Sequence, residues 1–459
     1  MRKYRDVFSK FLYGVVALAA SAVPAAAQKN PLTLEECVAM ALQSNLQIEV
    51  AMEKLTEKDA AIGEAETSRL PKLSGQAAYL RMIPQPSQTM PVVADLLAAQ
   101  EPPYYGAVAP LKYQEFKGSG NIYTANLSLQ QVLYTGGKIT NYKKMAEQNR
   151  TMAEWQQKSV VREIRRDVTK AYYNALAANR SIVALDSAIS MMEVMIRDLS
   201  NAVEVGMRGE HELLQAQVQL LNQRLARQQA ATGAQAAHDY LSTLIGVSVD
   251  TPIILAEGMD EPESLNLAEL SALQAKAREV STDLKALDEQ LKIIETLLLI
   301  TGASNIPTIA AGAEYNGQGM GGFGKDFDWT NGGRLSLGLQ WDIYDGNSVS
   351  HKRKQTLSQK RQLELNMEYL RVNLDMLVKN NYASLRDAFA SIETGHKSIE
   401  QTRKSYEISY DKHQEGMLLS SELLNAQNLR LQAEISYYAA LSNFYAKRAE
   451  LDYLVNEEK

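Results

Sequence analysis

The chain has 459 residues, and its 54 aspartates and glutamates outnumber 48 lysines and arginines, which gives a formal net charge of −6. This balance, without a basic cluster in the sequence, excludes a nucleic-acid-binding protein. Cys37 is the single cysteine, so no disulfide forms within the chain, and its neighbours Leu34, Val38 and Ala41 indicate a small buried side chain. Five histidines and no cysteine cluster predict neither a metal site nor another cofactor.

Residues 1–27 have the form of a secretory signal peptide. Four basic residues open the segment, Phe11–Ala20 is apolar, and the alanines at 25–27 form a small-residue cleavage site. Cleavage there leaves 44 basic and 53 acidic residues in an exported chain. Beyond this segment no apolar run reaches the roughly 18–20 residues that a membrane-spanning helix needs. Any membrane-spanning segments are therefore expected to be strands.

One structural unit is written twice along the chain. The glycine corner Glu204–Gln217 returns as Gln414–Gln427, 210 residues later. The same offset relates Tyr172 to Tyr382 and Tyr134 to Tyr344. The alternative, chance similarity of two Ala/Gln-rich helices, does not explain an offset that holds over some eighty residues. We predict two repeats, 28–246 and 264–459, joined by a linker at 247–263.

Each repeat is predicted to begin with a helix that a proline ends. The first covers 33–69, with Thr33 as its N-cap and Pro71 beyond its end. Its copy covers 264–302 and precedes Pro307. Here the offset is 236, because the first repeat carries 26 extra residues before the shared Tyr-x-Gly motif.

Four segments alternate between apolar and polar residues and are predicted to be strands of two hairpins, 72–134 and 307–344. The clearest is Arg334–Ile343, and the others are Leu73–Tyr79, Tyr123–Gln130 and Thr308–Tyr315. Strands of about ten residues with one apolar face suit a transmembrane β-barrel. On the strands alone, a soluble sheet with one wet face stays an open alternative. Four strands cannot close a barrel, for which about eight are needed, so either the chain oligomerises or the sheet is open.

The connections within the two hairpins differ. Residues 84–118 are rich in Pro and Tyr and show no period, whereas residues 317–333 are rich in Gly. Gly317, Gly319 and Gly322 spell the GxGxxG pattern of dinucleotide sites, which requires a helix directly after it. A strand is predicted there, so this interpretation is rejected.

Two very long helices, 138–205 and 347–415, follow the hairpins, and each is about 100 Å long at ~1.5 Å per residue. The first carries an unbroken apolar heptad seam from Ile164 to Val203, and the second a thinner one from Val378 to Tyr406. A seam this thin requires a coiled-coil partner. We predict the return helices after each glycine corner to be these partners, at 210–246 and 419–455.

In this order, the motifs resemble those of the TolC family of outer-membrane efflux proteins, over essentially the whole chain after the signal peptide. The motifs are Leu32-Thr33-Leu34-Glu35-Glu36 with Ala41-Leu42 and Asn45, Leu70-Pro71-Lys72-Leu73, Leu127-Ser128-Leu129 running to Tyr134-Thr135-Gly136-Gly137, and both glycine corners. The resemblance implies an α+β membrane fold with four transmembrane strands per chain. It further implies a homotrimer, with a twelve-stranded barrel among outer-membrane lipids of a Gram-negative bacterium and a long helical coiled-coil barrel in the periplasm.

The resemblance also implies a passive channel for tripartite efflux or type I secretion. An inner-membrane pump of RND, ABC or MFS type supplies the energy, and a periplasmic adaptor docks at the helical tips. The implied docking residues are Val205, Gly206 and Met207 in the first corner and Glu415, Gly416 and Met417 in the second, where Glu415 replaces a valine of the family pattern. The pump selects the substrate, so this chain does not name it.

Family members close the periplasmic tip partly with carboxylates six and nine residues after the second glycine. Glu422 matches the first carboxylate, and Asn425 stands in place of the second. The first corner offers Glu212 and Gln215 at the same distances. His413 and Leu418 replace the tyrosine and arginine of the family pattern. The resemblance therefore implies one carboxylate ring, and the alternative is that Glu422 is an ordinary solvated helix residue.

Two other functions compete with a channel, namely a periplasmic coiled-coil scaffold and a trimeric adhesin. The scaffold leaves the strands unexplained, and an adhesin would not repeat its hairpins inside helical coils. Enzyme signatures are missing from the sequence. His211-Glu212 begins like a zinc-protease helix, but Gln215 replaces the second histidine. We therefore expect a channel without enzymatic activity.

Overall fold

The computed structural model describes residues 31–83, 87–92, 112–117, 121–256, 258–321 and 328–456. The predicted signal peptide, residues 1–27, lies outside the described residues. The chain divides into two compact units, each of which takes segments from both predicted repeats. Unit 1 combines residues 1–54, 153–286 and 366–459, and unit 2 combines residues 55–152 and 287–365.

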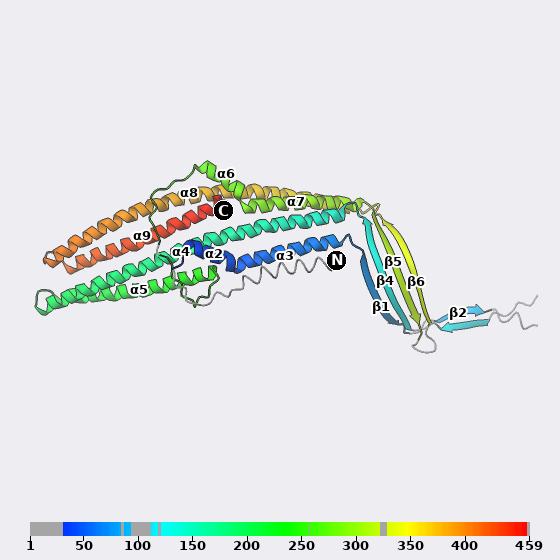
Figure 1. Ribbon diagram of the computed structural model, residues 1–459, viewed down its shortest axis with the longest axis horizontal. Coiled ribbons are helices and arrows are strands. Elements are labelled where there is room, and N and C mark those ends of the chain that lie inside the picture. Colours follow the sequence, from blue (N-terminus) through cyan, green and yellow to red (C-terminus); the bar gives the residue numbers. More distant parts are fainter. Residues whose placement is uncertain are drawn as a thin grey trace, which may run out of the picture. The chain divides into compact units, whose positions relative to one another are not determined.

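The described part of unit 1 is helical apart from its turns and linker (Figure 1). In chain order, the α-helices of the described residues are α2 (Leu34–Ser44), α3 (Leu46–Thr67), α4 (Lys138–Glu204), α5 (Glu210–Leu244), α6 (Leu270–Val280), α7 (Thr282–Gly302), α8 (Ser348–Gln414) and α9 (Ser420–Val455). Helices α3, α4, α7 and α8 contribute residues to both units. Over the described ranges, no helix has an apolar stretch long enough to cross a membrane.

The heptad seam of α4 faces the core of unit 1. Towards the middle of the helix, Ile164 and Val168 pack in one apolar cluster with Leu241 of α5. Further along, Met192 and Leu199 pack with Leu423 of α9 and with α5. The return helix α5 therefore packs on the unbroken apolar seam of the long helix α4.

The second long helix has the same kind of partner. Val378, Leu385 and Ile392 of the α8 seam pack with Leu441 and Phe444 of α9. Figure 1 shows α8 and α9 side by side in unit 1. The polar surface of α8 therefore surrounds a narrow apolar contact that α9 covers.

Asn45 breaks the first predicted helix, which corrects the expectation of one continuous helix over 33–69. The backbone of Asn45 is extended, with φ −77° and ψ 123°. The side-chain nitrogen of Asn45 donates to the carbonyl of Leu244 at 2.9 Å, and its side-chain oxygen accepts from the backbone amide of Gln47 at 2.9 Å. A side chain that satisfies the local backbone in this way competes with helical hydrogen bonding and starts a new helix. Thr33 caps α2 as predicted, in a capping box with Glu36.

Ser281 breaks the equivalent helix of the second repeat, 236 residues after Asn45. The structure starts this helix at Leu270 and divides it into α6 and α7, which corrects the prediction of one helix over 264–302. Ser281 has φ −57° and ψ 114°, and its hydroxyl oxygen accepts from the amide of Leu284 at 3.3 Å. Both breaks lie at the same repeat position, so the interruption belongs to the repeated unit.

The linker between the repeats is bound to the segment that precedes α2. Leu32 forms a parallel bridge with Leu255. The hydroxyl of Tyr172 in α4 lies 3.2 Å from the carbonyl oxygens of Leu32 and Ala256 and donates to them. Burial raises the pKa of Tyr172 to about 12, so the phenol stays a neutral donor.

Tyr172→Phe is expected to lower the free energy of unfolding by about 1–2 kcal/mol, because buried carbonyls lose a donor. The matched control is Tyr382→Phe at the equivalent repeat position, where the ring packs against the α8–α9 core and the hydroxyl bonds to no described residue. Chemical denaturation followed by circular dichroism measures both variants. Equal losses would mean that Tyr172 contributes through ring packing alone.

Unit 2 contains an antiparallel four-stranded sheet in the order β1-β4-β5-β6 (Figure 1). Its strands are β1 (Lys72–Arg81), β4 (Asn121–Tyr134), β5 (Thr308–Met320) and β6 (Asp328–Gln340). β4 and β5, one from each repeat, pair in the centre, so β1 and β6 are the edges. The two predicted hairpins thus join into one sheet.

The register of this sheet brings together the faces that the sequence alternation predicts. Leu73, Leu129, Ala313 and Leu335 lie opposite one another across the four strands. The next row along is polar and consists of Ser74, Ser128, Glu314 and Arg334. In that row the two serine hydroxyls are 2.7 Å apart, and the arginine pairs with the glutamate. Because side chains alternate between faces, the sheet has one apolar face and one polar face.

A second, two-stranded sheet lies within residues 84–118, where no periodic structure was predicted. β2 (Ser87–Val92) pairs with β3 (Lys112–Lys117) in antiparallel register. Sequence alternation arises only when one face of a strand is buried, whereas backbone pairing needs no such pattern. The absence of a period in the sequence therefore did not exclude strands here.

Part of the glycine-rich segment of the second hairpin lies within strand β5 of the four-stranded sheet. Gly317 and Gly319 lie within β5, while Gly322 lies outside the described residues. A Cβ atom on Gly317 would collide with the ring of Trp329 on β6. Glycine is needed there because a cross-strand aromatic ring covers the backbone.

Candidate functional site

Two glycine corners end the long helices of unit 1 with the same geometry. At Gly206, φ is 74° and the following amide donates to the Ala202 carbonyl at 2.8 Å. At Gly416, φ is 76° and the following amide donates to the Lys412 carbonyl, also at 2.8 Å. A left-handed residue followed by this bond is the Schellman motif, which favours glycine because other residues are strained at positive φ.

The residues predicted to dock an adaptor lie on the surface of these corners. The side chains of Val205, Met207 and Met417 are 70%, 79% and 68% exposed, and Glu415 is exposed as well. A Cβ atom added to either glycine would meet no atom within 4 Å. Each corner therefore presents apolar side chains around an open backbone turn.

Polar side chains connect the two corners. Ser420, the first residue of α9, is 1% exposed, and its hydroxyl donates to the carboxylate of Glu212 in α5. The Ser420 oxygen also lies 3.0 Å from Nε2 of His413. The guanidinium of Arg208 donates to the His413 carbonyl at 3.3 Å and lies 3.6 Å from the Glu212 carboxylate. Glu212 and Arg208 of the first corner thus bind the Ser420 hydroxyl and the His413 carbonyl of the second corner.

The protonation of this connection follows from its geometry. Burial, reinforced by the Arg208 cation, lowers the pKa of His413, and Glu212 and Asp198 oppose that shift. The ring is therefore neutral at neutral pH. The Ser420 hydroxyl donates its hydrogen bond to Glu212, so the Ser420 oxygen is the acceptor in its contact with His413. The neutral imidazole must therefore carry its proton on Nε2.

The predicted gate residues lie in two different environments. Glu212 is held by Ser420 and Arg208, as described above. Glu422, in the first turn of α9, is exposed, and its carboxylate makes no hydrogen bond or ion pair with any described residue. Asn425 is exposed one turn later, and the amide nitrogen of Gln215 lies 3.0 Å from Nε2 of His211. Of the two acids, Glu422 is the one whose carboxylate is available to an ion from solution.

Two residues of this site were not found from the sequence. Ser420 carries no signal, because serine is common at helix starts and its burial depends on the neighbouring corner. Arg208 does carry one, since the arginine of the family pattern, replaced by Leu418 in the second corner, stands two residues after the first glycine instead. Comparing the two corners with each other would have identified it.

Solved structures share the fold on which these corners stand. A membrane protein from Pseudomonas aeruginosa aligns over 92% of this chain and 93% of its own, with a TM-score of 0.72 and 16% identity. The outer membrane protein VceC from Vibrio cholerae aligns over 92% and 95%, with a TM-score of 0.67 and 15% identity. The open-state outer membrane channel MtrE from Neisseria gonorrhoeae aligns over 92% and 88%, with a TM-score of 0.69 and 15% identity. These alignments confirm the predicted fold class, an α+β chain of the TolC type.

Protein CyaE of Bordetella pertussis is similar in sequence over part of its length. The two chains are 28% identical over 190 residues, which is 40% of this chain and 39% of CyaE. The match thus spans about two fifths of that curated relative.

The profile of the outer membrane efflux protein family matches residues 37–247 and 273–457. The chain belongs to this family, as its motifs indicated. It is a TolC-like transport protein of the outer membrane, a channel for efflux or secretion, and its helical part lies in the periplasm.

Proposed function

We propose that three copies of this chain form a passive channel that leads from a periplasmic adaptor and an inner-membrane pump to the exterior. The observation that carries the proposal is the open sheet of unit 2. β1 and β6 are edge strands, and Leu335 on β6 is 86% exposed. Unpaired backbone groups in lipid cost several kcal/mol each. Pairing of β1 in one copy with β6 in the next removes every edge and closes a twelve-stranded barrel.

Uncovered apolar stripes on the helices support association between copies. On α5 a stripe of four exposed apolar residues alternates in spacings of four and three, and it consists of Leu214, Val218, Leu221 and Leu225. On α8 a stripe with the same kind of spacing consists of Tyr369, Val372 and Met376. Such spacing is that of a coiled-coil seam, and a single chain leaves both stripes in water. We assign them to contacts between neighbouring copies.

The glycine corners take two roles in this proposal. Val205, Gly206 and Met207, with Glu415, Gly416 and Met417, receive the adaptor through exposed apolar side chains. The gate uses Glu422, and the contact of Glu212 with Ser420 holds the two corners of each copy together. The chain conducts passively, because the pump supplies the free energy.

A periplasmic scaffold and a trimeric adhesin are the alternatives. The exposed apolar face of the sheet favours a lipid-facing strand set over a water-soluble scaffold. Reconstitution into a planar bilayer separates the three functions, because only the channel gives discrete ion conductance. Light scattering of the detergent-solubilised protein gives a trimer mass if the proposal holds, and a stable monomer contradicts it.

Leu335→Lys is expected to prevent assembly of the trimer in membranes, because a lysine facing mid-bilayer lipid costs about 2–4 kcal/mol in each copy. Ser336→Lys is the matched control, since it adds the same charge one residue further along, on the opposite face of β6. The readout is the fraction of heat-modifiable trimer in outer-membrane extracts. Equal assembly of both variants would show that the apolar face does not meet lipid.

A further inference from the structure

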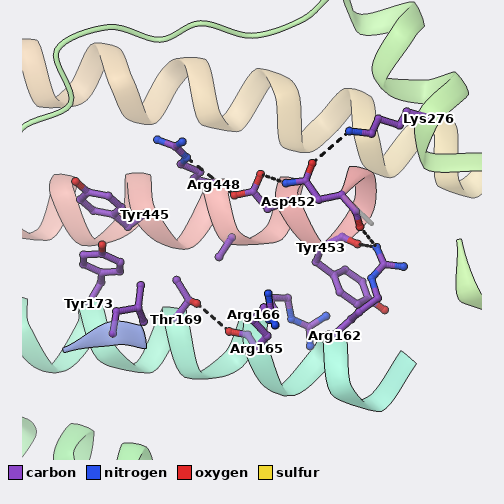
Figure 2. Close-up of a pocket in the computed structure, with 13 residues that line it drawn as sticks. Arg162, Arg165, Arg166, Thr169, Tyr173, Lys276, Tyr445, Arg448, Asp452 and Tyr453 are labelled. Carbon is purple, nitrogen blue, oxygen red and sulfur yellow. Dashed lines mark hydrogen bonds and ion pairs between the residues drawn. The ribbon is translucent and has the colours of Figure 1, made fainter. Parts of the chain in front are cut away.

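A cavity of about 780 Å³ in unit 1 is lined largely by basic side chains. Arg162, Arg165 and Arg166 come from α4, Arg448 comes from α9, and Lys276 comes from α6. Asp452 is the one carboxylate among the lining residues. Figure 2 shows Arg162, Arg165 and Arg166 between α4 and α9, while Arg448 and Lys276 lie on the side of α9 towards α6. A chain with a net charge of −6 thus assembles a local excess of positive charge from three helices.

Two of the five cations have structural roles. Arg162 donates to the carbonyls of Val280 at 3.1 Å, Asn456 at 3.1 Å and Tyr453, which are at or near the ends of α6 and α9. Cations are favourable at helix C-termini, where carbonyls have no helical partner. Arg166 pairs with Asp167 at 2.8 Å and lies over the ring of Tyr453. These two arginines are occupied by the fold itself.

The other three cations lack such partners. The guanidinium of Arg165 makes no hydrogen bond or ion pair with any described residue. Arg448 lies 4.0 Å from Asp452, and both side chains are more than half exposed. Lys276 has one long contact, 3.5 Å to the side-chain oxygen of Asn456. Like charges gathered around one cavity repel one another, and an anion between them removes that repulsion.

Two tyrosines complete the wall as neutral side chains, and the hydroxyl of Tyr445 already donates to the Asp260 carbonyl at 2.7 Å. The rings of Tyr173 and Tyr445 stack with centroids 3.9 Å apart and an interplanar angle of 5°. Burial raises the pKa of Tyr173 to about 12 and raises the pKa of Tyr445 as well. Both phenols therefore keep their protons and add no negative charge to the cavity.

We propose that this cavity binds a small multivalent oxyanion of the phosphate or carboxylate class, held by Arg165, Arg448 and Lys276. A ligand with two or more negative charges matches a wall that carries five cations and one carboxylate, and planar guanidinium groups bind carboxylate and phosphate oxygens bidentately. The volume lies within the range of small-molecule sites. The site is separate from the glycine corners and from the sheet, so it does not depend on the proposed channel function.

Isothermal titration of the full-length, detergent-solubilised protein with pyrophosphate, and separately with citrate, tests the proposal. We expect saturable binding with one site per chain, which weakens as salt is raised because the contacts are ionic. Arg165→Gln combined with Arg448→Gln should reduce the affinity by about tenfold or more. Arg197→Gln combined with Arg403→Gln removes the same charge from exposed positions on α4 and α8 and should leave the affinity unchanged.

The two anions identify which chemistry the site prefers, since pyrophosphate and citrate carry similar charge on different groups. Circular dichroism of each variant establishes that it is folded, and Arg165→Lys with Arg448→Lys should retain part of the binding because the charge is kept. Absence of saturable binding to the wild type overturns the proposal. Equal loss in the double variant and in its control also overturns it, because the binding would then follow net charge rather than this cavity.

Discussion

Gly416→Trp is expected to abolish efflux while the trimer still assembles. Gly416 has a positive φ, and a side chain there destabilises the fold by about 1–2 kcal/mol. The chain is expected to stay folded, because the coiled-coil contacts of α8 outweigh this cost. The space beyond it is open within the chain, so the indole would project from the corner and block the adaptor. Drug susceptibility of cells that carry the variant should equal that of cells without the channel.

Gly416→Ala separates strain from bulk. Alanine imposes the same backbone strain, but its methyl group meets no atom within 4 Å, so efflux should largely persist. Trimer content is measured in the same extracts, and single-channel conductance should be unaffected in both variants. Unchanged drug susceptibility with tryptophan at position 416 would remove the second corner from the docking surface.

The repeated elements were predictable because local chemistry determines them. A glycine with a left-handed backbone ends each long helix, and the period of two on β5 and β6 reports directly which face is apolar. Both signals depend on residues close together in sequence. Because the two corners are related by an offset of 210 residues, the structure expected at one corner is also expected at the other.

The features that the sequence did not reveal depend on contacts between distant segments. Asn45 breaks a helix because its side chain forms a hydrogen bond with the Leu244 carbonyl. Ser420 is buried because its hydroxyl forms a hydrogen bond with the Glu212 carboxylate. The basic cavity joins side chains of α4, α6 and α9, which lie far apart in the sequence. Polar side chains of this kind have no periodicity, so only the tertiary arrangement gives them partners.

Glu422→Gln is expected to weaken block of the channel by multivalent cations from the periplasmic side by about tenfold or more. In the proposed trimer, three copies of this exposed carboxylate approach the pore axis at the corners. Like charges in a narrow ring repel one another, so a cation that neutralises them binds tightly and makes the pore cation-selective. Asn425→Asp adds a second ring one turn further along α9 and should strengthen the block.

Glu212→Gln is the informative comparison because it removes a carboxylate from the same corner. Ser420 donates to Glu212 and Arg208 lies beside it, so its charge is already compensated and the effect on block should be smaller. The measurement is single-channel recording with a lanthanide series on the wild type and the three variants. Equal blocking constants for the wild type and Glu422→Gln would show that Glu422 is only a solvated helix residue. A larger effect of Glu212→Gln than of Glu422→Gln would move the gate to the contact between the corners, since opening would then require the Ser420 hydrogen bond to break.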